Sequence, residues 1–214
     1  ATPKGEIVWK ISGPPDIAEY KPGPDGKPKP YNPTNVAIAP NGDVYVADGY
    51  GSSYISQYTQ HGKYIRTFGG KGKELGQLST PHGIWLDDRS GSPLLMVADR
   101  SNNRIQRFTL EGKAIDIVPG TTMPCHFDAH NGVVVVPDLQ GKVTLLDKEN
   151  KVIEYLGDAG AKSMDDLREL RTETRDHFIP GKFVCPHSSC FDHTGNIFVV
   201  EWVEVGRVSK LRRV

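Results

Sequence analysis

The sequence predicts an all-β fold, a β-propeller of four blades in which each blade is a four-stranded antiparallel sheet. The first observation is the stretch 35–70, where four short runs of β-branched and aromatic residues are separated by turn sequences. The second is that the same pattern returns in 83–120, in 126–157 and from residue 188 to residue 214. Repeats of about 40 to 60 residues with four strands each are typical of propeller blades.

The strands expected in 35–70 are the runs VAIA, VYVA, YISQY and YIRTF. Between them stand Pro-Asn-Gly, Asp-Gly-Tyr-Gly and His-Gly, which supply the backbone conformations that tight turns require. Runs of the same kind include LLMVAD and RIQRF in the second repeat and VVVVPD and KVTLLD in the third. Each repeat therefore predicts a meander of neighbouring strands.

The fourth copy contains three of the four expected strands, whereas the segment 5–13 (GEIVWKISG) has the pattern of an outer strand with no blade before it. The outer strands of the complete copies read GKYIRTFGG, GKAIDIVPG and NKVIEYLGD. We therefore expect the strand at about 6–11 to complete the last blade, so that no sheet edge stays open. On this interpretation the whole chain, 1–214, is a single domain.

Two insertions, 14–33 and 158–184, interrupt the repeats. The first is rich in proline, which cannot donate regular ladder hydrogen bonds, and it predicts a loop over one rim of the ring. The second predicts a short amphipathic helix, because Ser163 can cap its N-terminus and Leu167 and Leu170 fall on one face. This insertion would either cover a rim or form a gate for a partner or substrate.

Charge and composition narrow the classes of partner and location. The chain has 26 Lys and Arg residues and 26 Asp and Glu residues. This balance of charge argues against sequence-independent electrostatic binding of nucleic acid. No apolar run approaches the roughly 20 residues that a membrane-spanning helix needs. The chain begins with Ala-Thr-Pro-Lys, which is typical of a processed N-terminus, so we expect an extracytoplasmic location, periplasmic or secreted.

Each repeat also carries an acidic residue at the end of its second strand. A carboxylate beside a turn can accept hydrogen bonds from backbone amides, so we expect a structural role. The alternative is that the four carboxylates together hold a cation. These residues are Asp48, Asp99, Asp138 and Glu201.

Histidines stand just before the first strand of three repeats, in Pro81-His82, Pro124-Cys125-His126 and Cys185-Pro186-His187. This connection lies at one mouth of a propeller's central channel, so the side chains should converge there. Neutral imidazoles are ligands for zinc or another divalent transition metal, and three donors with one open position suit a catalytic site. His82, His126 and His187 are therefore candidate metal ligands.

The alternative is a structural role, in which each histidine only stabilises a turn through a hydrogen bond to a backbone carbonyl. Cys125, Cys185 and Cys190 are additional candidate ligands, which would suit a mixed zinc or copper site. A disulfide between two of them would remove them as ligands, and the sequence leaves the pairing open.

The sequence contains none of the common nucleophile, zinc-protease or phosphate-loop motifs. An enzyme built on this chain would therefore have to be metal-assisted, with a neighbouring side chain as proton donor or charge stabiliser. The candidates near the channel mouth are Tyr50, Tyr54, Arg100 and Arg104.

The segments 97–108 (VADRSNNRIQRF) and 76–83 (GQLSTPHG) carry the blade pattern of NHL repeats, and nearly the whole chain outside the insertions resembles NHL-repeat propellers. Within that family, the first two blades look most like those of peptidylglycine amidating lyase and related secreted bacterial proteins. The resemblance implies a six-bladed, zinc-dependent enzyme whose ligand histidines face the central channel. Two features differ: four blades are expected here, and Tyr54 stands where the family pattern has an arginine, although Arg104 keeps that position in the next blade.

Three functions are compatible with these features. The first is a secreted binding or scaffold module that presents one rim of the ring to a protein or to itself, with a metal at the channel mouth as a further option. The second is a metal-dependent lyase or hydrolase resembling the amidating lyase. The third is a self-assembling extracellular structural protein.

Overall fold

The structure is a computed structural model that describes residues 3–158, 160 and 163–213, and the strands within them form four antiparallel sheets. Consecutive strands are neighbours in every sheet, which confirms the predicted all-β propeller of four blades. The first blade contains β1 (Asn35–Ile38), β2 (Val44–Ala47), β3 (Tyr54–Tyr58) and β4 (Tyr64–Gly69). The second contains β5 (Pro81–Asp87), β6 (Leu94–Asp99), β7 (Arg104–Phe108) and β8 (Ala114–Val118).

The other two blades come from the second half of the chain. The third contains β9 (Asp128–His130), β10 (Val133–Asp138), β11 (Lys142–Leu146) and β12 (Val152–Leu156). The fourth contains β13 (Pro186–Phe191), β14 (Ile197–Glu201) and β15 (Arg207–Leu211).

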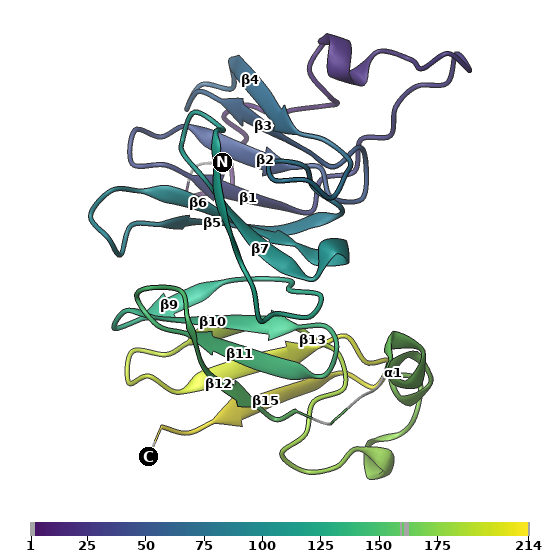
Figure 1. Cartoon of the computed structure of the whole chain (residues 1–214), viewed down its shortest axis with the longest axis vertical. Coiled ribbons are helices and arrows are strands. Elements are labelled where there is room, and N and C mark those ends of the chain that lie inside the picture. Colours follow the sequence, from purple (N-terminus) through teal and green to yellow (C-terminus); the bar gives the residue numbers. More distant parts are fainter. Residues whose placement is uncertain (1–2, 159, 161–162, 214) are drawn as a thin grey trace.

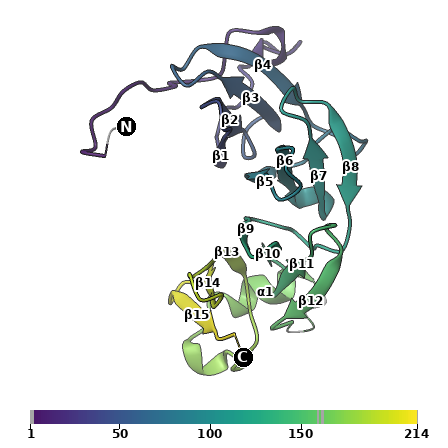
Figure 2. The same ribbon diagram turned by 90° about the vertical axis from the view of Figure 1, so that its left-hand side faces the viewer.

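The blades follow one another along an arc, from the first blade in purple and blue to the fourth in yellow (Figures 1 and 2). In Figure 2 the first strands β1, β5, β9 and β13 lie toward the inside of the arc, and β4, β8 and β12 lie on its outer side. Neighbouring blades contact each other through these inner strands, since β1 packs on β5 and β9 packs on β13. Residues at the start of the first strands are therefore directed to one inner region.

The second strand of an internal blade is buried on both faces, because the blade packs between two neighbours. In β6, Leu95 and Val97 belong to the core that is shared with the first blade. The alternate residues Met96 and Ala98 belong to the core that is shared with the third blade. This two-sided burial explains why the strand is a continuous apolar run rather than an alternating one.

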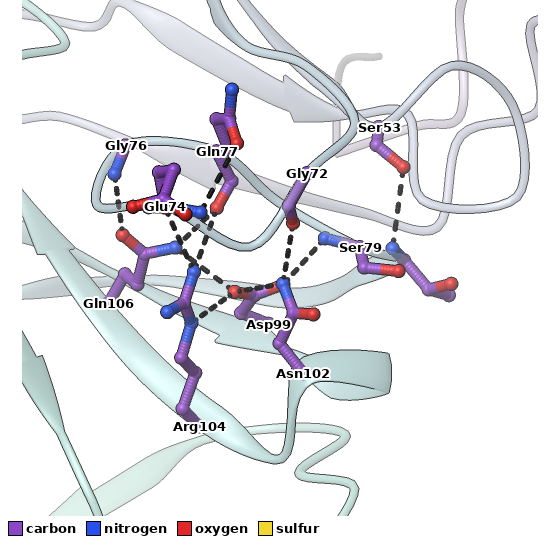
Figure 3. A network of polar contacts seen from close by, with 11 residues as sticks. Ser53, Gly72, Glu74, Gly76, Gln77, Ser79, Asp99, Asn102, Arg104 and Gln106 are labelled. Atoms are coloured by element: carbon purple, nitrogen blue, oxygen red, sulfur yellow. Dashed lines mark hydrogen bonds and ion pairs between the residues drawn. The ribbon is translucent and has the colours of Figure 1, made fainter.

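The acid at the end of each second strand is buried and accepts a hydrogen bond from the linker that enters its own blade. The backbone N–H groups are those of Asn32 to Asp48 (2.6 Å), Ser79 to Asp99 (2.6 Å), Thr122 to Asp138 (3.1 Å) and Val184 to Glu201 (2.7 Å). Figure 3 shows the second blade, where Arg104 and Gln106 also donate to Asp99. We propose a structural role for the four acids, because each fixes the linker that carries the next strand inward.

The insertion 158–184 folds over the end of the third and fourth blades and contains α1 (Met164–Leu170) and the 3-10 helix η3 (Arg175–His177). Ser163 caps α1 as predicted, since its side chain accepts from the backbone N–H of Asp166 at 3.2 Å. Leu167 is buried in a cluster with Leu139 and Val203, which anchors the helix to the blades.

Two further 3-10 helices are η1 (Ala18–Tyr20), in the proline-rich loop, and η2 (Arg100–Asn102), directly after β6. Among the described residues, the structure has no helix long and apolar enough to cross a bilayer.

The segment 5–13 does not complete the fourth blade, so the closing strand expected at about 6–11 is not found. In the described residues this segment forms no strand, and the fourth sheet consists of β13, β14 and β15. Trp9 lies instead against the first blade, where its indole Nε1 donates to the carbonyl of Gln60 at 2.8 Å. The alternating pattern indicates that a segment can be extended, but it does not determine which part of the fold the segment contacts.

Deleting residues 1–12 is therefore expected to lower the free energy of unfolding by only about 1 kcal/mol, because the described part of this segment forms no strand, so no β-ladder is broken, and the loss includes the hydrogen bond from Trp9 to Gln60. For a protein of this size, that change corresponds to a melting temperature lower by about 2–4 °C, which calorimetry measures. The Trp9→Ala variant should reproduce the part of the effect that comes from this hydrogen bond. A truncated protein that aggregates or fails to fold would instead support ring closure by this strand.

Candidate metal centre

Three side chains from different parts of the arc form a group that could hold a metal ion. One ligand atom from each of His82, Cys125 and His187 lies within 4.8 Å of the others. The two imidazole rings meet edge to face with their centroids 4.7 Å apart. Two histidines and one cysteine are a donor set that zinc and other soft divalent metals accept.

The blade repeat explains why these side chains meet. His82 lies at the start of β5, His187 at the start of β13, and Cys125 in the linker before β9. These three strands lie toward the inside of the arc (Figure 2). Each candidate ligand follows by three positions a linker residue whose N–H is held by a blade acid: Ser79, Thr122 and Val184. The same backbone anchor therefore sets the position of all three candidate ligands.

Burial controls the protonation of the histidines. It lowers the pKa of His82 to about 4, and the nearby charge of Arg100 acts in the same direction. Burial and Arg100 also lower the pKa of His187. Both rings are therefore favoured in the neutral form that can coordinate a metal.

The thiol of Cys125 behaves differently, because burial raises its pKa to about 12. It is a protonated thiol in the metal-free protein, and a metal ion would have to displace its proton to use the sulfur as a ligand.

The hydrogen bonds of His82 define which ring nitrogen is available. Nδ1 lies 2.9 Å from the carbonyl oxygen of Cys125, and since a carbonyl can only accept, Nδ1 carries the proton. The lone pair of the neutral ring is then on Nε2, which lies 3.1 Å from the hydroxyl of Tyr50. A backbone acceptor on the far nitrogen is the usual support of a metal-binding histidine, so the residues present fit a divalent transition metal.

Tyr50 and Arg100 form the rim of this group. The Arg100 guanidinium donates to the Tyr50 hydroxyl at 3.1 Å and lies 5.1 Å from the centre of the Tyr50 ring. Tyr50 can reach His82 because Gly49 lets the first blade approach the second closely. A Cβ on Gly49 would collide with the carbonyl oxygen of Pro81.

A cavity of about 330 Å³ adjoins the group. Tyr50, Arg100 and His187 line it on the side of the candidate ligands. The other lining residues come from linkers, from the end of the fourth blade and from the insertion: Met123, Leu139, Met164, Arg168 and Trp202. The arrangement therefore combines metal ligands, a hydroxyl, two cations and an apolar wall around one space.

The structure places several of the predicted site residues elsewhere. His126 is not part of the group that could hold a metal, although it lies close enough to contribute to the lowered pKa of His187. Cys185 is buried in the core beneath α1, and Cys190 is exposed on β13. All three cysteines are free thiols, so no disulfide removes Cys125 from the group.

Tyr54 and Arg104 do not contact His82 or His187. The Tyr54 ring packs against Tyr20, with centroids 5.4 Å apart, in the first blade. Arg104 pairs with Asp99 at 2.7 Å and belongs to the structural network of Figure 3.

The residues that sequence reasoning missed are Met164, Arg168 and Trp202, which line the cavity from the insertion and from the end of β14. The predicted amphipathic helix was the available signal, because its Leu167 face had to pack on the propeller and so brought its neighbours to the rim.

No protein-family model matches the chain. The chain is 31% identical over 187 residues to peptidyl-glycine alpha-amidating monooxygenase B of Xenopus laevis, a match that covers 84% of this chain and 20% of that protein. It is 38% identical over 73 residues to peptidyl-alpha-hydroxyglycine alpha-amidating lyase 2 of Drosophila melanogaster, which covers 34% of this chain and 17% of the relative. The chain thus spans about a fifth of the length of these curated relatives.

Among solved structures, a protein of unknown function from Bacteroides caccae has a TM-score of 0.55 at 13% identity, over 84% of this chain and 62% of that one. This similarity shows the fold alone. The sequence matches show distant homology to the amidating lyases, which confirms the resemblance seen in the blade motifs.

Proposed function

We propose, from its distant homology to the amidating lyases, that this chain is a metal-dependent lyase that cleaves the C–N bond of an N-acyl-α-hydroxyglycine. The observation that carries the proposal is the group of His82, Cys125 and His187 with Tyr50 and Arg100 at its rim. The cavity beside this group supports an enzyme rather than the scaffold role that the sequence suggested first.

The reaction needs no oxidant and consumes no water. The hydroxyl O–H bond of the substrate breaks, and its electron pair becomes the second bond of a new C=O group. The C–N bond at the same carbon breaks. The nitrogen leaves with the electron pair of the C–N bond and takes up a proton. The products are a primary amide and glyoxylate.

A divalent metal bound by His82, His187 and Cys125 would supply Lewis-acid polarisation of the substrate's hydroxyl oxygen. The hydroxyl group of Tyr50 would relay the proton from the substrate's oxygen to the leaving nitrogen, a role supported by its position at the edge of the ligand group and in the lining of the cavity. Arg100 donates to the Tyr50 oxygen, and its positive charge stabilises negative charge that develops there.

The direct test is release of glyoxylate from N-benzoyl-α-hydroxyglycine by protein loaded in turn with zinc, manganese, iron(II) or cobalt. We expect release above the protein-free rate with at least one metal, and its loss after chelation. Absence of release with all four metals would exclude this reaction.

Replacing Tyr50 with phenylalanine is expected to lower kcat about a hundredfold, because general acid–base groups contribute roughly 10²–10⁴ in rate. Steady-state kinetics of glyoxylate release measures the effect. Tyr54→Phe is the matched control, since the Tyr54 ring packs in the first blade away from the ligand group. Equal rates for the Tyr50→Phe variant and the parent protein would remove Tyr50 from the proposed mechanism.

The same homology supports an extracytoplasmic location, which stays a proposal. Binding of a partner to one rim and self-assembly also stay proposals. Self-assembly would be contradicted if size-exclusion chromatography showed a monodisperse monomer at tens of micromolar.

A further inference from the structure

The cavity beside the candidate metal centre has two walls of different origin. The blades provide Tyr50, Arg100 and His187 on one side. The insertion provides Met164 and Arg168 on the other, both from α1. The repeats therefore build the ligand group, and a segment outside the repeats completes the space next to it.

The helix α1 is held firmly against the end of the fourth blade. Leu167 is 2% exposed and packs in a cluster with Cys125 and Leu139. Directly after the helix, the Arg171 guanidinium lies 3.7 Å from the centre of the Trp202 ring, and the Arg171 carbonyl accepts from the backbone N–H of Glu204 at 3.0 Å. These contacts fix where Arg168 enters the wall of the cavity.

Arg168 is the cation of the cavity that can bind a ligand most easily. Arg100 already donates to Tyr50. In the described part of the chain, Arg168 forms an ion pair with Asp165 on its own helix, at 2.9 Å, and both side chains of this pair are mostly exposed. An exposed ion pair of this kind contributes little free energy, so a carboxylate from a ligand can replace Asp165.

The remaining wall is apolar. Met123, Leu139 and Met164 line the cavity together with the indole of Trp202. A cavity of about 330 Å³ is at the small end of the range for small-molecule sites. It suits a ligand of one amino acid with an acyl group better than a long peptide.

We propose that α1 is the substrate-selecting element of this chain, and that Arg168 binds the carboxylate of a small N-acylglycine-type ligand whose apolar acyl group packs on Trp202 and the two methionines. The identity of the reaction rests on the proposed function, whereas the binding step does not. Arg168 is a specificity-determining residue here, since it lines the same cavity as His187 without belonging to the ligand group.

The test is isothermal titration of the full, metal-loaded protein with two unreactive probes, N-benzoylglycine and N-benzoylglycinamide. The probes differ only in whether the glycine ends in a carboxylate or in a neutral amide. We expect N-benzoylglycine to bind the parent protein at least about tenfold more tightly, the usual effect of a charge-assisted hydrogen bond. In Arg168→Gln this preference should fall to about twofold or less.

Asp165→Asn is the matched control, because it breaks the same ion pair but leaves the guanidinium in the cavity. It should keep the preference for the carboxylate. Equal binding of the two probes to the parent protein, an undiminished preference in Arg168→Gln, or an equal loss in Asp165→Asn would each overturn the proposal. Melting curves and metal content of both variants establish that the fold and the metal centre are intact.

The two proposals fail separately. A carboxylate preference that depends on Arg168, without glyoxylate release by any metal-loaded form, would uphold this site and exclude the lyase reaction. Glyoxylate release without that preference would uphold the reaction and exclude the role of Arg168.

Discussion

Replacing Asp99 with alanine is expected to lower the free energy of unfolding by about 3–5 kcal/mol, the usual cost of removing one partner of a buried ion pair. Asp99 is fully buried and accepts from the backbone N–H of Ser79 at 2.6 Å and from Arg104 Nε at 2.7 Å. Gln106 Nε2 donates to the same carboxylate at 3.0 Å (Figure 3). The variant leaves the Arg104 charge, whose side chain is 13% exposed, without its partner. Urea unfolding followed by circular dichroism measures the loss.

The matched control is Asp116→Ala, which removes another Arg–Asp pair of the same blade, between Arg107 on β7 and Asp116 on β8. The Asp116 side chain is 42% exposed, so we expect a loss of about 1 kcal/mol or less. If the two variants lose similar amounts of unfolding free energy, the buried contacts of Asp99 with the linker before β5 stabilise the fold no more than an outer ion pair does.

The blades could be predicted from the sequence because each is a local unit. A four-stranded meander joins neighbours in sequence, so short apolar runs and their turn residues define it without information from distant segments. The segment 5–13 is the contrasting case. Its pattern matches an outer strand, but its Trp9 donates to the carbonyl of Gln60, 51 positions further along the chain, and no local pattern indicates that contact.

The candidate metal centre could be predicted in part for the same reason. His82 and His187 occupy equivalent positions in two repeats, three residues after an anchored linker residue. In the third repeat the residue three positions after the anchored Thr122 is Cys125. Reasoning from residue type therefore named His126 as a candidate ligand and Cys125 only as an additional one, whereas the backbone anchor brings Cys125 to the group.

The cavity wall could not be predicted to the same extent. The sequence predicts a helix capped by Ser163 with Leu167 buried, but the positions of Met164 and Arg168 depend on where the insertion folds back. The contacts of Arg171 with Trp202, 31 residues along the chain, and with Glu204 contribute to that position, and they are tertiary interactions without a sequence signal.

Replacing both His82 and His187 with alanine is expected to abolish metal binding and to lower glyoxylate release to the protein-free rate. The parent protein should hold about one metal ion per chain, since three donors are the usual protein ligand set of a catalytic zinc site. The double variant retains only the Cys125 sulfur of the group, and burial opposes its ionisation. Elemental analysis of untagged protein measures the metal directly and does not depend on the choice of substrate.

The matched control is the double variant His61→Ala/His193→Ala, which removes the same number of imidazoles from exposed turns of the first and fourth blades. It should keep both the metal and the activity. If it loses as much metal as His82→Ala/His187→Ala, binding is nonspecific and the group at the inside of the arc is not the metal centre. If the inner double variant keeps its metal, His82 and His187 are turn-stabilising residues, because the Nδ1 bond from His82 to the Cys125 carbonyl would then be the main function of that ring.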